Sequence, residues 1–149
     1  MRSISSPESV LVAIGSNLRN RLYNLRRAVD ELQRVMSIVR VSSVYETEPV
    51  DAPPRSPRFL NMVVAGHTNL TPEALLIQFL DIERRLGRVR GGRNAPRTID
   101  LDLILHSANV RRSAALTLPH PRYLQRDFVM QPLRELHLGW RDPVTGSRL

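Results

Sequence analysis

Hydrophobic and polar positions repeat along the chain with two periods, one typical of strands and one of helices. The apolar run at 10–14 predicts a buried strand, and residues 38–47 alternate and are rich in β-branched side chains, which predicts a second. Residues 59–68 predict a third strand. Residues 98–105 alternate apolar and polar side chains with period two and predict a fourth. A turn, 15–17, follows the first strand.

Two segments carry apolar residues at steps of three and four, which predicts amphipathic helices. The first is 18–36, where Asn17 or Asn20 could cap the start. The second is 70–87, with Pro72 in its first turn and a glycine at its end. After residue 106 the pattern is less regular, with prolines as breaks and a possible helical turn at 122–126.

The order strand–helix–strand occurs twice, which predicts a fold class of α+β, a ferredoxin-like sandwich. Its mainly antiparallel sheet would have the helices packed on one face and the other face free. We expect a single domain over residues 1–149, with 1–9 as a flexible tail. Segment 48–58 holds four prolines and should be an exposed lid or binding loop that lines a cleft on the free face.

Composition narrows the chemistry. All 22 basic residues are arginine, against 14 acidic residues, which gives a net charge of +8. The absence of lysine excludes a P-loop lysine and Schiff-base chemistry, and the absence of cysteine excludes disulfides and thiolate metal sites. No apolar run or secretory signal indicates a membrane or export, so we expect a cytoplasmic protein. The basic charge favours anionic partners, either nucleotides or nucleic acid.

Asp100 and Asp102 are the candidate metal ligands. They share one face of the predicted strand, where Ile99, Leu101, Leu103 and Leu105 would face the other side, so their charges repel and need a cationic partner. Mg²⁺ commonly takes one or two carboxylates plus substrate phosphates, and the arginines of segment 84–97 could bind those phosphates. This favours phosphoryl-type transfer. The alternative is a solvated acidic pair with surface ion pairs.

Other positions stay open on spacing alone. Asn61 is either a ligand-facing amide or an ordinary polar group at a sheet edge. Phe59 and Phe128 are as well explained by core packing, and His120 by a turn between two prolines. The strand followed by Gly-Ser-Asn and a helix lacks the further glycines of a phosphate-binding loop.

Seven motifs occur in an order and at gaps that closely resemble the 6-hydroxymethyl-7,8-dihydropterin pyrophosphokinase family of folate biosynthesis. The resemblance covers residues 10–137 and is most specific in PRTIDLDLIL followed by LPHPR. The motifs are AIGSN at 13–17, YETEPV at 45–50, FLN at 59–61, IERRLGRVR at 82–90, PRTIDLDLIL at 96–105, LPHPR at 118–122 and RDFVMQPL at 126–133.

The resemblance implies transfer of the β,γ-diphosphate of ATP to the hydroxymethyl group of the pterin, with release of AMP. It implies that Asp100 and Asp102 bind two Mg²⁺ ions and that Arg88 and Arg97 are catalytic. The nucleotide-binding residues it implies are Arg88, Arg93, Arg97, Leu103, Thr117, His120 and Arg126.

For the pterin, the resemblance implies an aromatic sandwich with a polar rim. The substrate-binding residues it implies are Asn17, Thr47, Val50, Phe59, Asn61 and Phe128. The partners would be ATP and 6-hydroxymethyl-7,8-dihydropterin, without nucleic acid or membrane, and the protein would be a monomer.

The chain departs from many relatives in its arginine loop, where Asn94 stands in place of a tryptophan that helps close the site. We therefore expect an active enzyme with altered lid behaviour. Two rival functions stay open at this point: a nucleic-acid-binding module of the same fold, and a metal-dependent nucleotidyl transferase acting on another acceptor.

Overall fold

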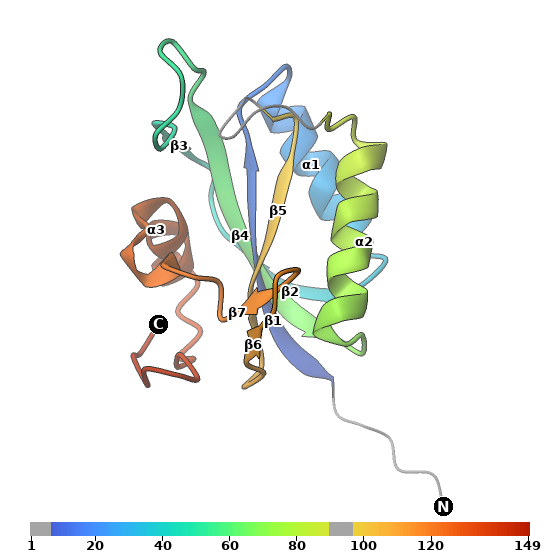
Figure 1. Cartoon of the computed structure of the whole chain (residues 1–149), viewed down its shortest axis with the longest axis vertical. Coiled ribbons are helices and arrows are strands. Elements are labelled where there is room, and N and C mark those ends of the chain that lie inside the picture. The colour runs from blue at the N-terminus through green and yellow to red at the C-terminus, as the bar shows by residue number, and fades with distance from the viewer. Residues whose placement is uncertain (1–6, 90–96) are drawn as a thin grey trace, which may run out of the picture.

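The computed structural model describes residues 7–89 and 97–149 and shows one sheet with helices on both faces (Figure 1). The sheet has five strands in the order β2-β4-β1-β5, with β3 also paired to β4, and every pairing is antiparallel. Its strands are β1 (Glu8–Ser16), β2 (Ser37–Val41), β3 (Tyr45–Thr47), β4 (Phe59–Thr68) and β5 (Asp100–His106).

The remaining elements of the described ranges are three α-helices, one 3-10 helix and a small two-stranded sheet. They are α1 (Arg21–Leu32), α2 (Pro72–Arg85), α3 (Asp127–Glu135), η1 (Tyr123–Gln125), β6 (Arg111–Arg112) and β7 (Thr117–Leu118). The predicted α+β class and antiparallel sheet are confirmed. None of the helices in the described ranges is long and apolar enough to cross a membrane.

Helices α1 and α2 pack on one face of the sheet, as predicted. Alternate residues of β1 and β4 share a core there with the buried stripes of both helices, including Leu25 of α1 and Phe79 of α2. The side chains of Asn20 and Thr71 cap the two helices by accepting backbone N–H bonds from Tyr23 and Ala74. Both helices are shorter than predicted: α1 spans Arg21–Leu32 within the predicted 18–36, and α2 spans Pro72–Arg85 within the predicted 70–87.

The other face of the sheet, which we predicted to be free, is covered in part by α3 (Figure 1). Val129, Met130 and Leu133 of α3 pack on the alternate residues of the central strands, including Leu11 of β1 and Val63 of β4. The sequence analysis missed α3 because Pro132 looked like a break. Proline occupies the sixth position of this nine-residue helix.

The C-terminal end of α3 is attached to the chain between β2 and β4. Glu135 accepts hydrogen bonds from the backbone N–H of Ser43 at 2.7 Å and from the Tyr45 hydroxyl at 2.7 Å. Arg40 of β2 donates to the backbone oxygens of Leu136 and His137. These contacts fix α3 relative to the start of β3.

Several strand limits differ from the sequence prediction, and β5 spans Asp100–His106 where 98–105 was predicted. β1 begins at Glu8, so Glu8 and Ser9 are not tail residues, while 1–6 lie outside the described part. β1 also runs through Gly15, predicted as a turn, because this residue pairs with β4 on one side and β5 on the other. The predicted strand 38–47 is two strands, β2 and β3.

A bulge in β5 changes which side its later residues face. Leu11 pairs with Leu105 while Val12 pairs with Leu103, which leaves Ile104 as the extra residue. Leu103 therefore packs with α1 and α2, whereas Leu105 packs on the α3 face, contrary to the predicted alternation. Asp100 and Asp102 precede the bulge and keep their shared face.

We predict that Gly66→Ala destabilises the protein by about 3 kcal/mol. A Cβ at this position would lie 1.9 Å from the backbone oxygen of Ser37, because β2 approaches β4 closely beside its own bulge. Urea unfolding followed by circular dichroism measures the change. His67→Ala, on the exposed neighbouring residue, is the control and should change stability by about 0.5 kcal/mol or less. Equal effects of the two substitutions would contradict the prediction.

Candidate active site

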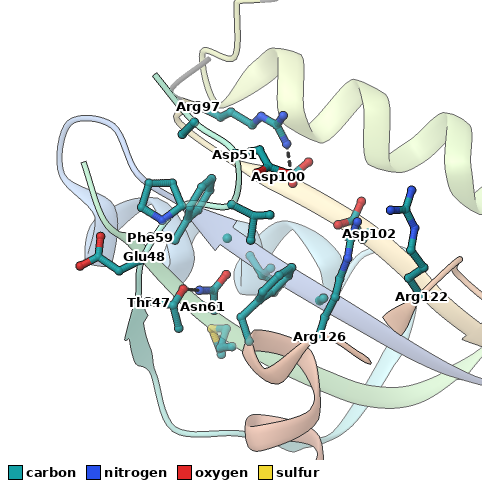
Figure 2. A pocket seen from close by; sticks show the side chains of 18 residues that line it. Thr47, Glu48, Asp51, Phe59, Asn61, Arg97, Asp100, Asp102, Arg122 and Arg126 are labelled. Carbon is teal, nitrogen blue, oxygen red and sulfur yellow. Dashed lines mark hydrogen bonds and ion pairs between the residues drawn. The ribbon is translucent and has the colours of Figure 1, made fainter. Parts of the chain in front are cut away.

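A cavity of about 200 Å³ opens on the α3 side of the sheet, where β1, β4 and β5 meet the loop after β3 (Figure 2). The segment 122–128 closes its remaining side. Nine of the sequence-predicted site residues line this one cavity. They are Thr47, Val50, Phe59, Asn61, Arg97, Asp100, Asp102, Arg126 and Phe128.

One end of the cavity combines an aromatic ring with an amide. Asn61 lies on β4, inside the sheet and only 8% exposed, which excludes the edge position left open by the sequence. Its Nδ2 donates to the Thr47 hydroxyl. Gly15 faces this pair, because a Cβ there would lie 3.0 Å from Asn61 Oδ1 and 3.3 Å from the Phe59 ring. The missing side chain makes room for both.

Asp100 is held by two arginines. Its carboxylate accepts hydrogen bonds from Arg88 at 3.1 Å and from Arg97 at 3.0 Å (Figure 2 draws the Arg97 bond). Arg88 also donates to the buried Glu83 at 2.7 Å. Glu83 in turn accepts the backbone N–H of Leu101 at 2.8 Å, so it ties Arg88 to the start of β5. This network compensates the charge of Asp100.

Asp102 has no such arginine partner. Within residues 7–89 and 97–149 the one basic side chain within ion-pair distance of its carboxylate is that of His120, at 3.9 Å, and this contact is an ion pair only when His120 is protonated. Burial, followed by the charges of Asp100 and Glu83, raises the pKa of Asp102 to about 8 although a third of its side chain stays exposed. Asp102 is therefore protonated near neutral pH unless a bound cation takes the place of the proton.

Basic groups surround the Asp102 end of the cavity. Arg126 lies over the ring of Phe128, 5.6 Å from its centroid, and its charge partly offsets that of Asp102. Burial and the charge of Arg126 lower the pKa of His120. His120 thus stays neutral near pH 7, with Nδ1 at 3.0 Å from the Pro121 carbonyl oxygen.

Five of the described sequence-predicted residues lie outside the cavity lining, and one of them is His120, which lines a neighbouring cavity. Asn17 is buried, with its amide bonded to the Arg97 backbone N–H at 2.7 Å and to the Pro57 oxygen at 3.2 Å, so it joins two loops instead of facing a ligand. Leu103 is buried in the core with α1 and α2. Thr117 lines a separate cavity, and Arg88 reaches the site through Asp100. Arg93 and Asn94 lie outside the described residues.

Sequence reasoning missed three residues of the site. Glu83 holds Arg88, Gly15 leaves room for Phe59 and Asn61 because it has no side chain, and Arg122 lines the cavity. Glu83 gave a usable signal, because it is an acidic residue on the apolar stripe of a predicted helix between Ile82 and Leu86. Arg122 gave none, since its position depends on the backbone conformation of the Pro121–Tyr123 turn.

Among the described residues, protein side chains alone do not form a complete metal site. In the part of the chain that the structure describes, no three His, Cys, Asp or Glu side chains are grouped to hold a metal ion. Two carboxylates facing an open cavity instead fit a cation that draws its other ligands from a bound phosphate.

Comparison with known proteins links this arrangement to one family. Residues 11–138 match the family described as 7,8-dihydro-6-hydroxymethylpterin-pyrophosphokinase (HPPK). The chain is 42% identical over 139 residues to the 2-amino-4-hydroxy-6-hydroxymethyldihydropteridine pyrophosphokinase of Porphyromonas gingivalis, covering 90% of this chain and 93% of that protein. The protein of that name from Bacillus subtilis is 42% identical over 84% of this chain and 75% of its own length.

Longer relatives contain a matching part. The mitochondrial folate synthesis bifunctional protein of Pisum sativum is 42% identical over 87% of this chain and 25% of its own length. The chain spans 19–28% of the bifunctional and fungal relatives it matches. The Plasmodium falciparum HPPK-DHPS crystal structure has the same fold, with a TM-score of 0.75 at 13% identity over 96% of this chain and 42% of that one.

We predict that Asp102→Asn stabilises the metal-free protein at high pH. An ordinary aspartate titrates near pH 3.9 when unfolded, so between about pH 4 and pH 8 the folded state alone keeps the proton, and stability falls as the pH rises. Removing the carboxylate should raise Tm by about 2–4 °C at pH 9 and change it little at pH 5. Thermal unfolding in EDTA measures this.

Asp100→Asn is the matched control and should lower Tm, because it removes the partner of Arg88 and Arg97. A Tm difference between Asp102→Asn and wild type that is the same at pH 5 and pH 9 would show that the pKa of Asp102 is not raised.

Proposed function

The chain belongs to the 7,8-dihydro-6-hydroxymethylpterin-pyrophosphokinase family, and from this premise we propose that it transfers the β,γ-diphosphate of ATP to 6-hydroxymethyl-7,8-dihydropterin. The products are the pterin diphosphate and AMP. The hydroxymethyl oxygen attacks the β-phosphorus and its proton passes to solvent, while the bond from that phosphorus to the α-phosphate oxygen breaks and AMP leaves with the electron pair.

The observation that supports this proposal best is the division of the cavity. An aromatic and amide end formed by Phe59, Asn61 and Thr47 adjoins an end of carboxylates and arginines, so one cavity offers places for a flat heterocycle and for a polyphosphate. Phe59 and Phe128 would contact the faces of the pterin ring. Asn61 would bind its polar edge, with Thr47 holding the amide.

Asp100 and Asp102 fit Mg²⁺, and we propose that they hold two ions together with the ATP phosphates. Burial, followed by the charges of Asp100 and Glu83, raises the pKa of Asp102, and a divalent cation would offset the cost of keeping this carboxylate charged. When bound, Mg²⁺ neutralises phosphate charge and polarises the phosphorus–oxygen bonds.

Arg97 and Arg88 would bind phosphate oxygens. Both guanidinium groups already lie beside Asp100, so a phosphate held near that carboxylate is within their reach. Planar guanidinium groups bind two phosphate oxygens at once, which lysine cannot do. Glu83 orients Arg88 for this role. His120 and Arg126 would bind the nucleotide phosphates at the Asp102 end.

The nucleic-acid-binding alternative gains no support from the site or from the relatives. Aromatic residues make up 5% of the chain, and the acidic pair would repel a phosphate backbone unless a metal is bound. Transfer to an acceptor other than a pterin is tested directly by Phe128→Ala, which would leave such an activity unchanged. We also propose that the protein acts as a monomer.

We predict that the protein releases AMP from ATP only when Mg²⁺ and the pterin alcohol are both present. Asp100→Ala and Asp102→Ala should each lower the rate of AMP release at least about 1000-fold, because phosphate charge is then no longer neutralised. Chromatography of the nucleotides measures AMP, and circular dichroism checks folding. AMP release without the pterin, or near-normal rates in a folded aspartate variant, would contradict the proposal.

We predict that Arg97→Ala lowers kcat about 100-fold or more but changes pterin affinity less than about threefold. The positive charge of Arg97 matters most as negative charge moves from the bond to the leaving phosphate. Single-turnover kinetics gives the rate and calorimetry the affinity. Arg84→Ala is the control, because Arg84 is exposed and pairs with Asp81. Weaker pterin binding at an unchanged rate would refute the assigned role.

A further inference from the structure

Arg122 lies where the cavity continues beyond Asp102. Figure 2 shows its side chain beside Asp102, on the side of the cavity away from Phe59 and Thr47. Arg122 lines this cavity and also a neighbouring one of about 270 Å³ formed by β6, β7 and the C-terminal segment. Arg122 therefore lies between the cavity that holds Asp100 and Asp102 and the neighbouring cavity.

The backbone of Arg122 has a conformation that favours glycine. Its φ is 62° and its ψ is 11°, in the left-handed region that residues other than glycine seldom adopt. Arg19 and Arg55 share this backbone, with φ of 62° and 64°, and all three residues are exposed, but Arg19 and Arg55 line neither cavity. Arg122 is thus the one of these three whose backbone directs a guanidinium into the site.

The guanidinium of Arg122 has donors to spare. In the ranges 7–89 and 97–149 no carboxylate lies within ion-pair distance of it, and its side chain makes no hydrogen bond. Arg122 and Arg126 therefore both line the end of the cavity that holds one carboxylate, Asp102. This surplus of positive charge suits a phosphate.

We infer that Arg122 binds the α-phosphate of the nucleotide, which becomes the phosphate of the leaving AMP. The inference rests on the proposed function. In an in-line displacement the attacking and leaving oxygens lie on opposite sides of the β-phosphorus. The pterin end is at Phe59 and Asn61, so the leaving oxygen lies toward Asp102, where Arg122 is.

The register of the sheet agrees with this direction. Asn61 and Asp100 both pair with Gly15, whereas Asp102 pairs with Ala13, two residues farther along β1. Two residues of a strand cover about 6.8 Å, so different parts of one triphosphate can lie beside the two carboxylates. Arg97 beside Asp100 thus faces the transferred diphosphate, and Arg122 faces the group left behind. Negative charge that builds on the α-phosphate as the bond breaks is stabilised by Arg122.

Arg122→Gly and Arg122→Asn test the inference, because both residues accept the left-handed backbone. Calorimetry in the presence of Mg²⁺ with AMP, inorganic pyrophosphate and α,β-methylene-ATP measures the binding. Both variants should bind AMP and the ATP analogue at least about 10-fold more weakly, since a charge-assisted hydrogen bond is lost, and should bind pyrophosphate as the wild type does. Arg97→Ala should show the reverse preference, with pyrophosphate weakened and AMP retained.

Arg19→Gly is the matched control, because it makes the same change at the same φ away from the cavity, and it should leave all three affinities unchanged. Unchanged AMP affinity in both Arg122 variants overturns the inference, as does an equal loss for AMP and pyrophosphate. Failure of the proposed function is read separately: wild-type protein would then release no AMP with the pterin alcohol.

Discussion

Electrostatic repulsion between two carboxylates on one strand determines how the site is built. Asp100 and Asp102 face the same way because β5 is regular up to its bulge, and a protein interior gives little screening to such a pair. The two are treated differently. Asp100 is neutralised by Arg88 and Arg97, and Asp102 is neutralised by a proton. A bound divalent cation would replace both arrangements at once and release the arginines toward a phosphate.

This compensation reaches well into the scaffold. Arg88 is held by Glu83, which is buried on α2 and bonded to the backbone of β5, and Arg97 is held through its backbone by Asn17 at the end of β1. Three elements therefore meet at one acidic pair. Residues outside the cavity thus help to position the arginines of the site. They also lower the stability of the fold in part, since buried carboxylates oppose folding unless they are paired.

Periodicity predicted most of the sheet and both helices of the first face, because each buries a regular stripe against a large core. It predicted that Asp100 and Asp102 share a face for the same reason. It did not predict α3, since Pro132 masks a helix whose burial depends on the opposite face, nor the bulge at Ile104, which no local pattern marks. Spacing singled out Asp100, Asp102 and the arginine segment that contains Arg97, and family resemblance supplied the roles of the other six predicted residues that line the cavity. The Asn17 amide bonds to a neighbouring loop and does not line the cavity, because a motif match does not say which way an amide side chain points.

The attachment of α3 has a consequence for which positions accept substitution. Ser43 is exposed and remote in sequence from the acidic pair, yet its backbone and hydroxyl both donate to Glu135, at the far end of the helix that carries Phe128. The same short stretch continues through Tyr45 to Thr47 in the cavity wall. Along this surface, the effect of a substitution will therefore depend on whether the residue is hydrogen-bonded to an element that forms the cavity. Its solvent exposure will be a poor guide to that effect.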